Sequence, residues 1–302
     1  MPEAIGWIVK ISSKKILVVC YFLIFLVLIL IFDSIWNRYG QIRLIVRGDD
    51  MGFSHEVNVA CIEAYQQGIL TAVEVMAPCD SFLEAVQLLN QNPGLDVGIH
   101  LTLTSEWENI KWGPLTDAPS LVDENGHFFQ MIWPDEAYPP SNALGTSDWK
   151  LDEIEKELRA QIELVLHHLP NCSHATPHMG FQSISPQVNR LAFNLIQEYN
   201  VDANIHFLPL KEVRLFGDAF AAEQMIANAV EVLENLGPGT WEFYEHPGLL
   251  SNEAEPHWHI GAEDDAVYRD AVTKALTSGK LKEVIRRRKI KLIGYNDLKF
   301  WY

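Results

Sequence analysis

Polar residues that could bind a metal or move a proton lie near the carboxyl ends of four predicted strands of this chain. They are Asp49 and Asp50 after the first strand, His100 in the third, His178 after the fourth, and Glu245-His246 after a later one. In a parallel α/β barrel the carboxyl ends of the strands meet on one face, which holds the active site. We therefore expect these residues to lie close together, although they are far apart in the sequence.

One carboxylate and two neutral imidazoles make a three-ligand site with open positions, as catalytic metals require. A metal there would lower the pKa of a bound water and polarise a carbonyl oxygen. One aspartate of the pair would bind the metal and the other would accept a proton from that water. His246 is the candidate for protonating a leaving amine. The sequence has no Gly-x-Ser-x-Gly elbow, so an acyl-serine route is unsupported.

Each residue also has a structural interpretation. Two adjacent aspartates can cap a helix. A single histidine in an apolar strand, such as His100 in GIHLTL, is more often a core residue. His174 and His178 have the spacing of two ligands on a helix, but Pro177 argues against a helix there. We expect one of these two histidines to be structural.

The elements that would position these residues alternate between strand and helix. Strands are predicted at Ile42–Arg47, Thr71–Ala77, Val97–Leu103, Val201–Ile205, Thr240–Tyr244 and Lys291–Ile293, with a short one before His178. Helices are predicted from Ser54 to Gln67, from a capping box at Ser81–Glu84, over Leu151–Leu169, from Ser185-Pro186, and near 221–236 and 264–278. This alternation predicts βαβ units and a (β/α) barrel, possibly short of eight strands, with a doubly wound open sheet as the alternative.

Residues 104–147 interrupt this alternation as an insert without a sustained period. Trp107, Trp112, Trp133 and Trp149, in or next to the insert, could stack on sugar rings, or could pack the insert onto the barrel. Glu74 is a further candidate for the barrel mouth. A solvated or paired glutamate is an equally good interpretation.

The composition of the chain excludes some classes of partner and a cysteine-based zinc site. A net charge of -17 argues against nucleic acid or an anionic membrane face as the partner. Cys61, Cys79 and Cys172 match no zinc ribbon and are expected to be buried.

The first forty residues differ from the rest of the chain. Ile16–Phe32 is an uncharged apolar run that, with its flanks, is about long enough to span a bilayer. Lysines precede it, which predicts a single-pass anchor with a cytoplasmic N-terminus and the catalytic domain outside. A signal peptide that is cleaved on export is the alternative. The predicted division is an anchor over 1–40 and one catalytic domain over 41–302.

Four motifs resemble those of the YdjC/ChbG-type carbohydrate deacetylases. RLIVRGDDMGFS resembles the opening N-A-D-D-F-G-h-S, GLDVGIHLTLT the motif G-h-H-L-x-L-T, SHATPHMG the motif T-H-h-x-x-H-x-H, and EHPG the late H-P-G. The resemblance covers most of residues 42–297, in the family's order. It implies a (β/α) barrel and metal-dependent removal of acetyl groups from N-acetylated sugars.

The same resemblance implies roles for individual residues. Asp50, His100 and His178 match the metal ligands, Asp49 the general base and His246 the general acid. One divalent ion is implied, either magnesium, which family descriptions often name, or zinc, which suits imidazole ligands better. The chain departs from the pattern at Arg47-Gly48, which replaces a small-polar pair, and at Gly180, which stands where a further histidine is usual.

The implied substrate is an N-acetylated oligosaccharide, or a glycan or glycolipid at the cell envelope. Two other functions fit the sequence less well. A non-catalytic glycan-binding protein would explain Gly180 but not the retained acid and base. A phosphoesterase would need a second metal about 3.5–4 Å from the first. An oligomer is compatible with the sequence, which does not indicate its size.

Overall fold

The computed structural model describes residues 21–28, 40–201, 210–251 and 255–300. The chain forms two compact units, Met1–Gln41 and Ile42–Tyr302. In the first unit only residues 21–28 are described in the predicted apolar run; they are helical, with exposed side chains. No helix among the described residues is both long and apolar enough to cross a membrane. The rest of the predicted anchor lies outside the described residues.

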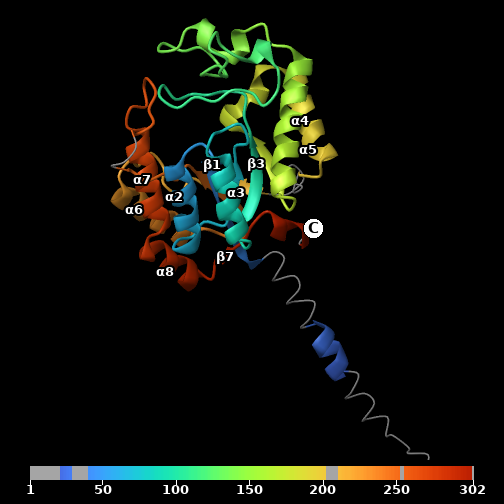
Figure 1. Cartoon of the computed structure of the whole chain (residues 1–302). Helices are drawn as coiled ribbons and strands as arrows, with labels where there is room; N and C mark the ends of the chain where they lie inside the picture. Colours follow the sequence, from blue (N-terminus) through green and yellow to red (C-terminus); the bar gives the residue numbers. More distant parts are fainter. Residues whose placement is uncertain (1–20, 29–39, 202–209, 252–254, 301–302) are drawn as a thin grey trace, which may run out of the picture. The chain divides into compact units, whose positions relative to one another are not determined.

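The second unit alternates strands and helices around one sheet (Figure 1). Its strands are β1 (Ile42–Met51), β2 (Ala72–Val75), β3 (Asp96–Leu101), β4 (His174–Pro177), β5 (Leu210–Glu212), β6 (Gly239–Glu245) and β7 (Lys291–Leu292). Its α-helices are α2 (His55–Gln66), α3 (Phe82–Gln91), α4 (Leu151–His168), α5 (Pro186–Glu198), α6 (Ala222–Asn235), α7 (Asp265–Leu276) and α8 (Gly279–Arg288). Short 3-10 turns are η2 (Pro119–Leu121), η3 (Pro140–Asn142), η4 (Leu144–Thr146), η5 (His178–Ile184) and η7 (Asn296–Phe300).

The strands form one sheet in the order β4-β3-β2-β1-β6-β5, with β7 also pairing with β1. Every pairing is parallel. The α/β class and the parallel sheet are therefore confirmed, but a closed barrel is not: β4 and β5 do not pair with each other among the described residues. The structure is a six-stranded half-barrel with β7 added at β1. The strand predicted at Val201–Ile205 lies almost wholly outside the described residues, and β5 and α8 were not predicted.

Side chains along each strand alternate between the two faces of the sheet, and the two faces differ in their surroundings. Leu44, Val46, Val73 and Ile99 belong to the main apolar core. The intervening positions include Ile45 and Ala72, which pack with Tyr295 in a second, smaller cluster. The same alternation carries polar side chains at Arg47, Glu74, His100 and His174 into the half-barrel, where they contact one another.

The packing of His174 against β3 requires a glycine on that strand. A Cβ atom at Gly98 of β3 would lie 2.4 Å from Nε2 of His174, which occupies that space. The His174 ring in turn lies against Tyr295, with ring centroids 3.8 Å apart. His174 is thus the structural member of the His174 and His178 pair, packed beneath the end of the sheet.

Two of the three predicted helix caps are confirmed. The side chains of Ser54 and Ser185 accept hydrogen bonds from the backbone N–H groups of Val57 and Val188, respectively. The capping box at Ser81 is wrong, because the Ser81 side chain makes no capping hydrogen bond. Glu84, its expected partner, instead binds Asn58 of α2.

The insert 104–147 is built from turns and isolated bridges, and it covers the end of the sheet opposite α8 (Figure 1). Glu157 of α4 anchors it by accepting hydrogen bonds from the backbone N–H groups of Leu115 and Thr116. Leu121 and Phe128 are buried in the main core. The insert therefore packs as part of the domain.

Candidate metal centre and cavity

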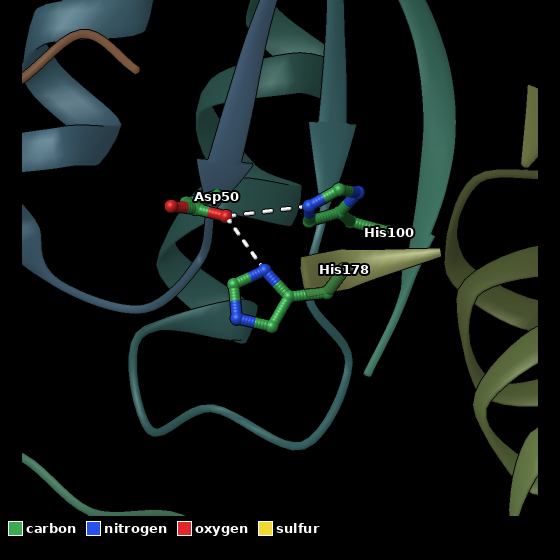
Figure 2. A group of neighbouring side chains, drawn as sticks. All are labelled: Asp50, His100 and His178. Atoms are coloured by element: carbon green, nitrogen blue, oxygen red, sulfur yellow. Dashed lines mark ion pairs between the residues drawn. The ribbon is translucent and has the colours of Figure 1, made fainter. Parts of the chain in front are cut away.

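Asp50, His100 and His178 come together at the carboxyl ends of β1, β3 and β4. Oδ1 of Asp50 lies 3.3 Å from Nε2 of His100 and 3.2 Å from Nδ1 of His178. Figure 2 shows both rings turned toward the same carboxylate oxygen. The rings meet edge to face, with centroids 5.1 Å apart. Three residues that are far apart in the sequence thus place one potential ligand atom each around a single position that an ion could occupy.

A β-bulge aims the aspartate. The pairing of β1 with β2 shifts register between Gly48 and Met51, and Asp50 within it has φ of 65°. Positive φ is uncommon for a residue with a side chain, although aspartate tolerates it better than most. Consecutive residues of a regular strand face opposite sides, whereas the bulge lets both Asp49 and Asp50 line the same cavity.

The three residues fit a divalent metal. Oδ1 of Asp50 is buried and has no hydrogen-bond partner among the described residues, which is costly unless a cation compensates it. Nitrogen and oxygen ligands bind zinc at about 2.0–2.2 Å, so atoms about 3.2 Å apart can share one ion. Two imidazoles and one carboxylate favour zinc or another transition metal over magnesium, which prefers oxygen ligands.

A second carboxylate holds each imidazole. Nδ1 of His100 lies 2.7 Å from Glu74, and Nε2 of His178 lies 3.1 Å from Glu106. Carboxylates in this position fix the orientation of metal-binding histidines and make them better ligands. Glu74 is completely buried under His100 and does not line the cavity, so its candidacy as a substrate-binding residue is wrong.

These carboxylates also change the proton affinity of the rings. Burial lowers the pKa of His100, but Asp50 and Glu74 outweigh burial and raise that pKa to about 10. Burial likewise lowers the pKa of His178, and Glu106 and Asp50 raise it to about 9. Without a metal, both rings therefore bind protons near neutral pH, and a metal ion must displace those protons.

The other oxygen of Asp50 is bound by an arginine. Arg269 of α7 donates from a terminal nitrogen to Oδ2 at 2.8 Å, and its Nε is 2.5 Å from Asp265. Burial raises the pKa of Asp50, but Arg269, followed by His246 and His178, holds it well below its ordinary value. Asp50 is therefore a carboxylate with one oxygen committed to Arg269 and one facing the histidines.

Asp49 is paired as well, and its partner is Arg47 from the same strand. Nε of Arg47 lies 2.6 Å from Oδ1 of Asp49 and a terminal nitrogen lies 3.0 Å from Oδ2. Arg47 also donates to Glu242 and Tyr295. The bidentate pair fixes the orientation of the Asp49 carboxylate at the cavity wall.

His246 follows β6 and reaches the site from the side opposite β4. Its Nε2 lies 3.9 Å from Oδ2 of Asp50, and its Nδ1 lies 3.7 Å from Glu245. Burial lowers the pKa of His246, but Asp50 and Glu245 raise it above its ordinary value. The side chain is 35% exposed, which leaves it accessible to a ligand.

A cavity of about 590 Å³ joins these groups to solvent. Its lining includes Trp107 and Gly180, in addition to the residues above. Gly180 has φ of 67°, and a Cβ atom there would lie 3.9 Å from its nearest neighbour, so the space beside Gly180 is open. Trp112 is buried and does not line the cavity; its assignment to sugar stacking is wrong. Trp133 is exposed but also lies outside the cavity lining.

Four residues at the site could not be placed there from the sequence. Arg269 and Asp265 lie on α7, 219 and 215 positions beyond Asp50, and only their i,i+4 spacing hinted at a pair. Glu106 lies in the aperiodic insert. Arg47 was noticed only as an unusual residue before the aspartates, and its pairing with Asp49 needs the strand geometry. The three cysteines are buried, as predicted.

Comparison with known proteins identifies the family of this chain. The model of the YdjC-like protein family matches residues 43–287, and the chain belongs to that family. Among its relatives is the protein named carbohydrate deacetylase 1 of Listeria innocua, which is 27% identical over 264 residues, covering 85% of this chain and all of the relative. The carbohydrate deacetylase of Brevibacillus brevis is 28% identical over 286 residues, covering 85% of this chain and 99% of the relative.

A solved structure from Enterococcus faecalis, titled "putative cellobiose-phosphate cleavage protein", shares the fold. It superposes with a TM-score of 0.65 at 24% identity, covering 85% of this chain and 99% of that one. Both relatives are matched over almost their whole length.

Proposed function

We propose that this chain is a metal-dependent hydrolase that removes acetyl groups from N-acetylated sugars. The observation that carries the proposal is the convergence of the buried Oδ1 of Asp50 with the ring nitrogens of His100 and His178, which lie 3.3 and 3.2 Å from it. Membership of a family whose named relatives are carbohydrate deacetylases supports the substrate class.

Asp50, His100 and His178 would hold one divalent ion, which would polarise the acetyl carbonyl and lower the pKa of a water molecule. Asp49 lies at the cavity wall, where it would act as the base that accepts a proton from the attacking water. Arg47 holds its carboxylate in one orientation. His246 has a raised pKa and an accessible ring, and it donates a proton to the departing amine.

A phosphoesterase with two metals is less well supported. Among the described residues a second group that could bind an ion is Asp49, Glu74 and His100. It shares His100 with the first group, and Arg47 lies 2.6 Å from Asp49 and 3.7 Å from Glu74. A second cation would have to displace this guanidinium.

The substrate is proposed to be an oligosaccharide, glycan or glycolipid outside the cytoplasm, with Met1–Gln41 as an anchor or cleaved leader. The 590 Å³ cavity is large enough for a sugar unit, and the open position at Gly180 would leave room for a substituent.

A screen of N-acetylated glycans for released acetate and newly formed amine tests the activity. We expect acetate and amine in equal amounts, loss of both after chelation, and recovery on adding zinc. A non-catalytic binding protein would bind glycans but release no acetate above an Asp49→Asn variant.

A further inference from the structure

The chain concentrates positive charge at one place, although its net charge is -17. Residues 279–291, which form α8 and the start of β7, hold seven of its 23 lysines and arginines and a single acid, Glu283. Fixed charges farther away than about 8 Å are largely screened at physiological ionic strength. A local cluster of this kind can therefore bind an anionic surface that the protein as a whole would repel.

Helix α8 is two-sided. Leu281, Val284 and Ile285 are buried on one side. Lys282, Arg286 and Lys289, spaced by four and three residues, are exposed along the other. We call these three residues the α8 basic ridge.

Two of the three ridge residues have no ion-pair partner among the described residues. Lys282 donates to the backbone oxygen of Gln67, and Arg287, beside the ridge, pairs with Glu234. Arg286 and Lys289 have no ion-pair partner among the residues that the structure describes. An exposed cation without an ion-pair partner in the described part of its own domain is available for a ligand.

The ridge also lies at a particular end of the domain. Lys291, just beyond it, is in register with Arg43 at the start of β1, whereas Asp50 and the cavity lie at the other end of that strand. Seven residues of strand correspond to about 23 Å. Figure 1 shows α8 and the insert 104–147 at opposite ends of the domain. The chain enters the domain at the ridge end, and the apolar run Ile16–Phe32 precedes that entry closely in the sequence.

We propose that the α8 basic ridge docks the catalytic domain on a bilayer surface that contains anionic phospholipids. Clusters of lysine and arginine bind such headgroups through their positive charge. Docking at this end turns the cavity away from the bilayer, so the substrate is a glycan reached from the aqueous side. The proposal stands or fails independently of the deacetylase activity.

Vesicle binding of residues 42–302 tests the ridge without the apolar run. This part is a compact unit, and relatives such as that of Listeria innocua consist of its counterpart alone. The ridge variant is Arg286→Gln with Lys289→Asn, since asparagine tolerates the left-handed backbone of Lys289. The control, Lys150→Gln with Lys156→Gln, removes the same charge from exposed lysines of the α4 region.

We expect the wild-type domain to co-sediment with phosphatidylcholine vesicles only when phosphatidylglycerol is included, and to dissociate at high salt. At about 1 kcal/mol per basic residue, the ridge variant should bind roughly 20- to 30-fold more weakly, and the control should bind like wild type. Equal binding to both vesicles, unchanged binding of the ridge variant, or binding to soluble polyanions but not to vesicles would overturn the proposal. Melting temperature verifies that both variants fold.

Discussion

Arg269 binds one carboxylate oxygen of Asp50 at 2.8 Å, and the other oxygen of Asp50 faces the two histidines. The arginine thereby leaves one oxygen of Asp50 to bind a metal. A carboxylate that supplied a single oxygen would leave more coordination positions for water and for a carbonyl oxygen than a bidentate one.

Replacing Arg269 by Gln should destabilise the metal-free protein by about 3 kcal/mol, because it leaves the buried Asp50 carboxylate without its counter-ion. Zinc should restore more stability to the variant than to wild type, since the ion compensates the same charge. Urea unfolding with and without zinc measures both effects. Arg159→Gln, which breaks the surface ion pairs of Arg159 with Glu155 of α4 and Glu198 of α5, is the control and should show no extra rescue by zinc. Equal gains from zinc in wild type and R269Q would contradict this account.

Glu74→Gln and Glu106→Gln should each weaken zinc binding by about 10- to 100-fold, because each removes the carboxylate that orients a histidine ligand. Isothermal titration calorimetry measures the dissociation constants. Glu155→Gln removes an exposed carboxylate of α4 and should leave zinc binding unchanged. Wild-type affinity in both site variants would mean that the histidines are positioned by other contacts.

Zinc binding should release protons and strengthen as pH rises from 6 toward 9. The pKa values of about 10 for His100 and about 9 for His178 mean that both rings are protonated in the metal-free protein over this range. Deprotonated imidazole is the ligand, so binding displaces these protons and becomes easier as pH approaches the pKa values. Calorimetry in buffers of different ionisation enthalpy counts the released protons. No release at pH 7 would show that the rings are already neutral.

The same shifts give a stability prediction of definite sign for the metal-free protein. The folded-state pKa values exceed the ordinary histidine value of about 6.5, so proton binding stabilises the fold fully below that pH. This contribution is lost as pH rises through 9 and 10. Urea midpoints should therefore fall between pH 6.5 and 10, and should fall less in a His100→Gln variant.

Asp49→Asn should lower the rate of acetate release by about 10²- to 10⁴-fold while zinc affinity stays near wild type. Asparagine keeps the shape of the side chain next to Arg47 but cannot accept the proton. Parallel measurements of turnover and of the zinc dissociation constant separate a base from a ligand. If zinc affinity falls in proportion to activity, Asp49 helps to hold the metal and is not the base.

The sequence was sufficient for the parts of the site that depend on strand order. Asp50, His100 and His178 lie at or just beyond the carboxyl ends of parallel strands, which predicts that they meet, whereas their selection as metal ligands came from the family resemblance. Arg269 could not be foreseen, because nothing local relates a residue of α7 to the end of β1. The failed capping box at Ser81 has the same cause, since Glu84 binds a tertiary partner, Asn58, in preference to its own helix terminus.

Whether the sheet closes into a barrel could not be predicted from the sequence either. Strand count and alternation are shared by closed barrels and open half-barrels, and the difference depends on whether β4 meets β5. The family resemblance, by contrast, rested on short motifs at strand ends and is confirmed by a match across residues 43–287.

Titration of metal-free protein with zinc, read out as acetate release from an N-acetylated oligosaccharide, tests the central claim most directly. Activity should rise linearly and stop at one zinc per chain, and His100→Ala and His178→Ala should stay inactive at that ratio. A break at two zinc ions per chain, full activity without metal, or wild-type activity in either variant would contradict a single Asp50-His100-His178 metal centre.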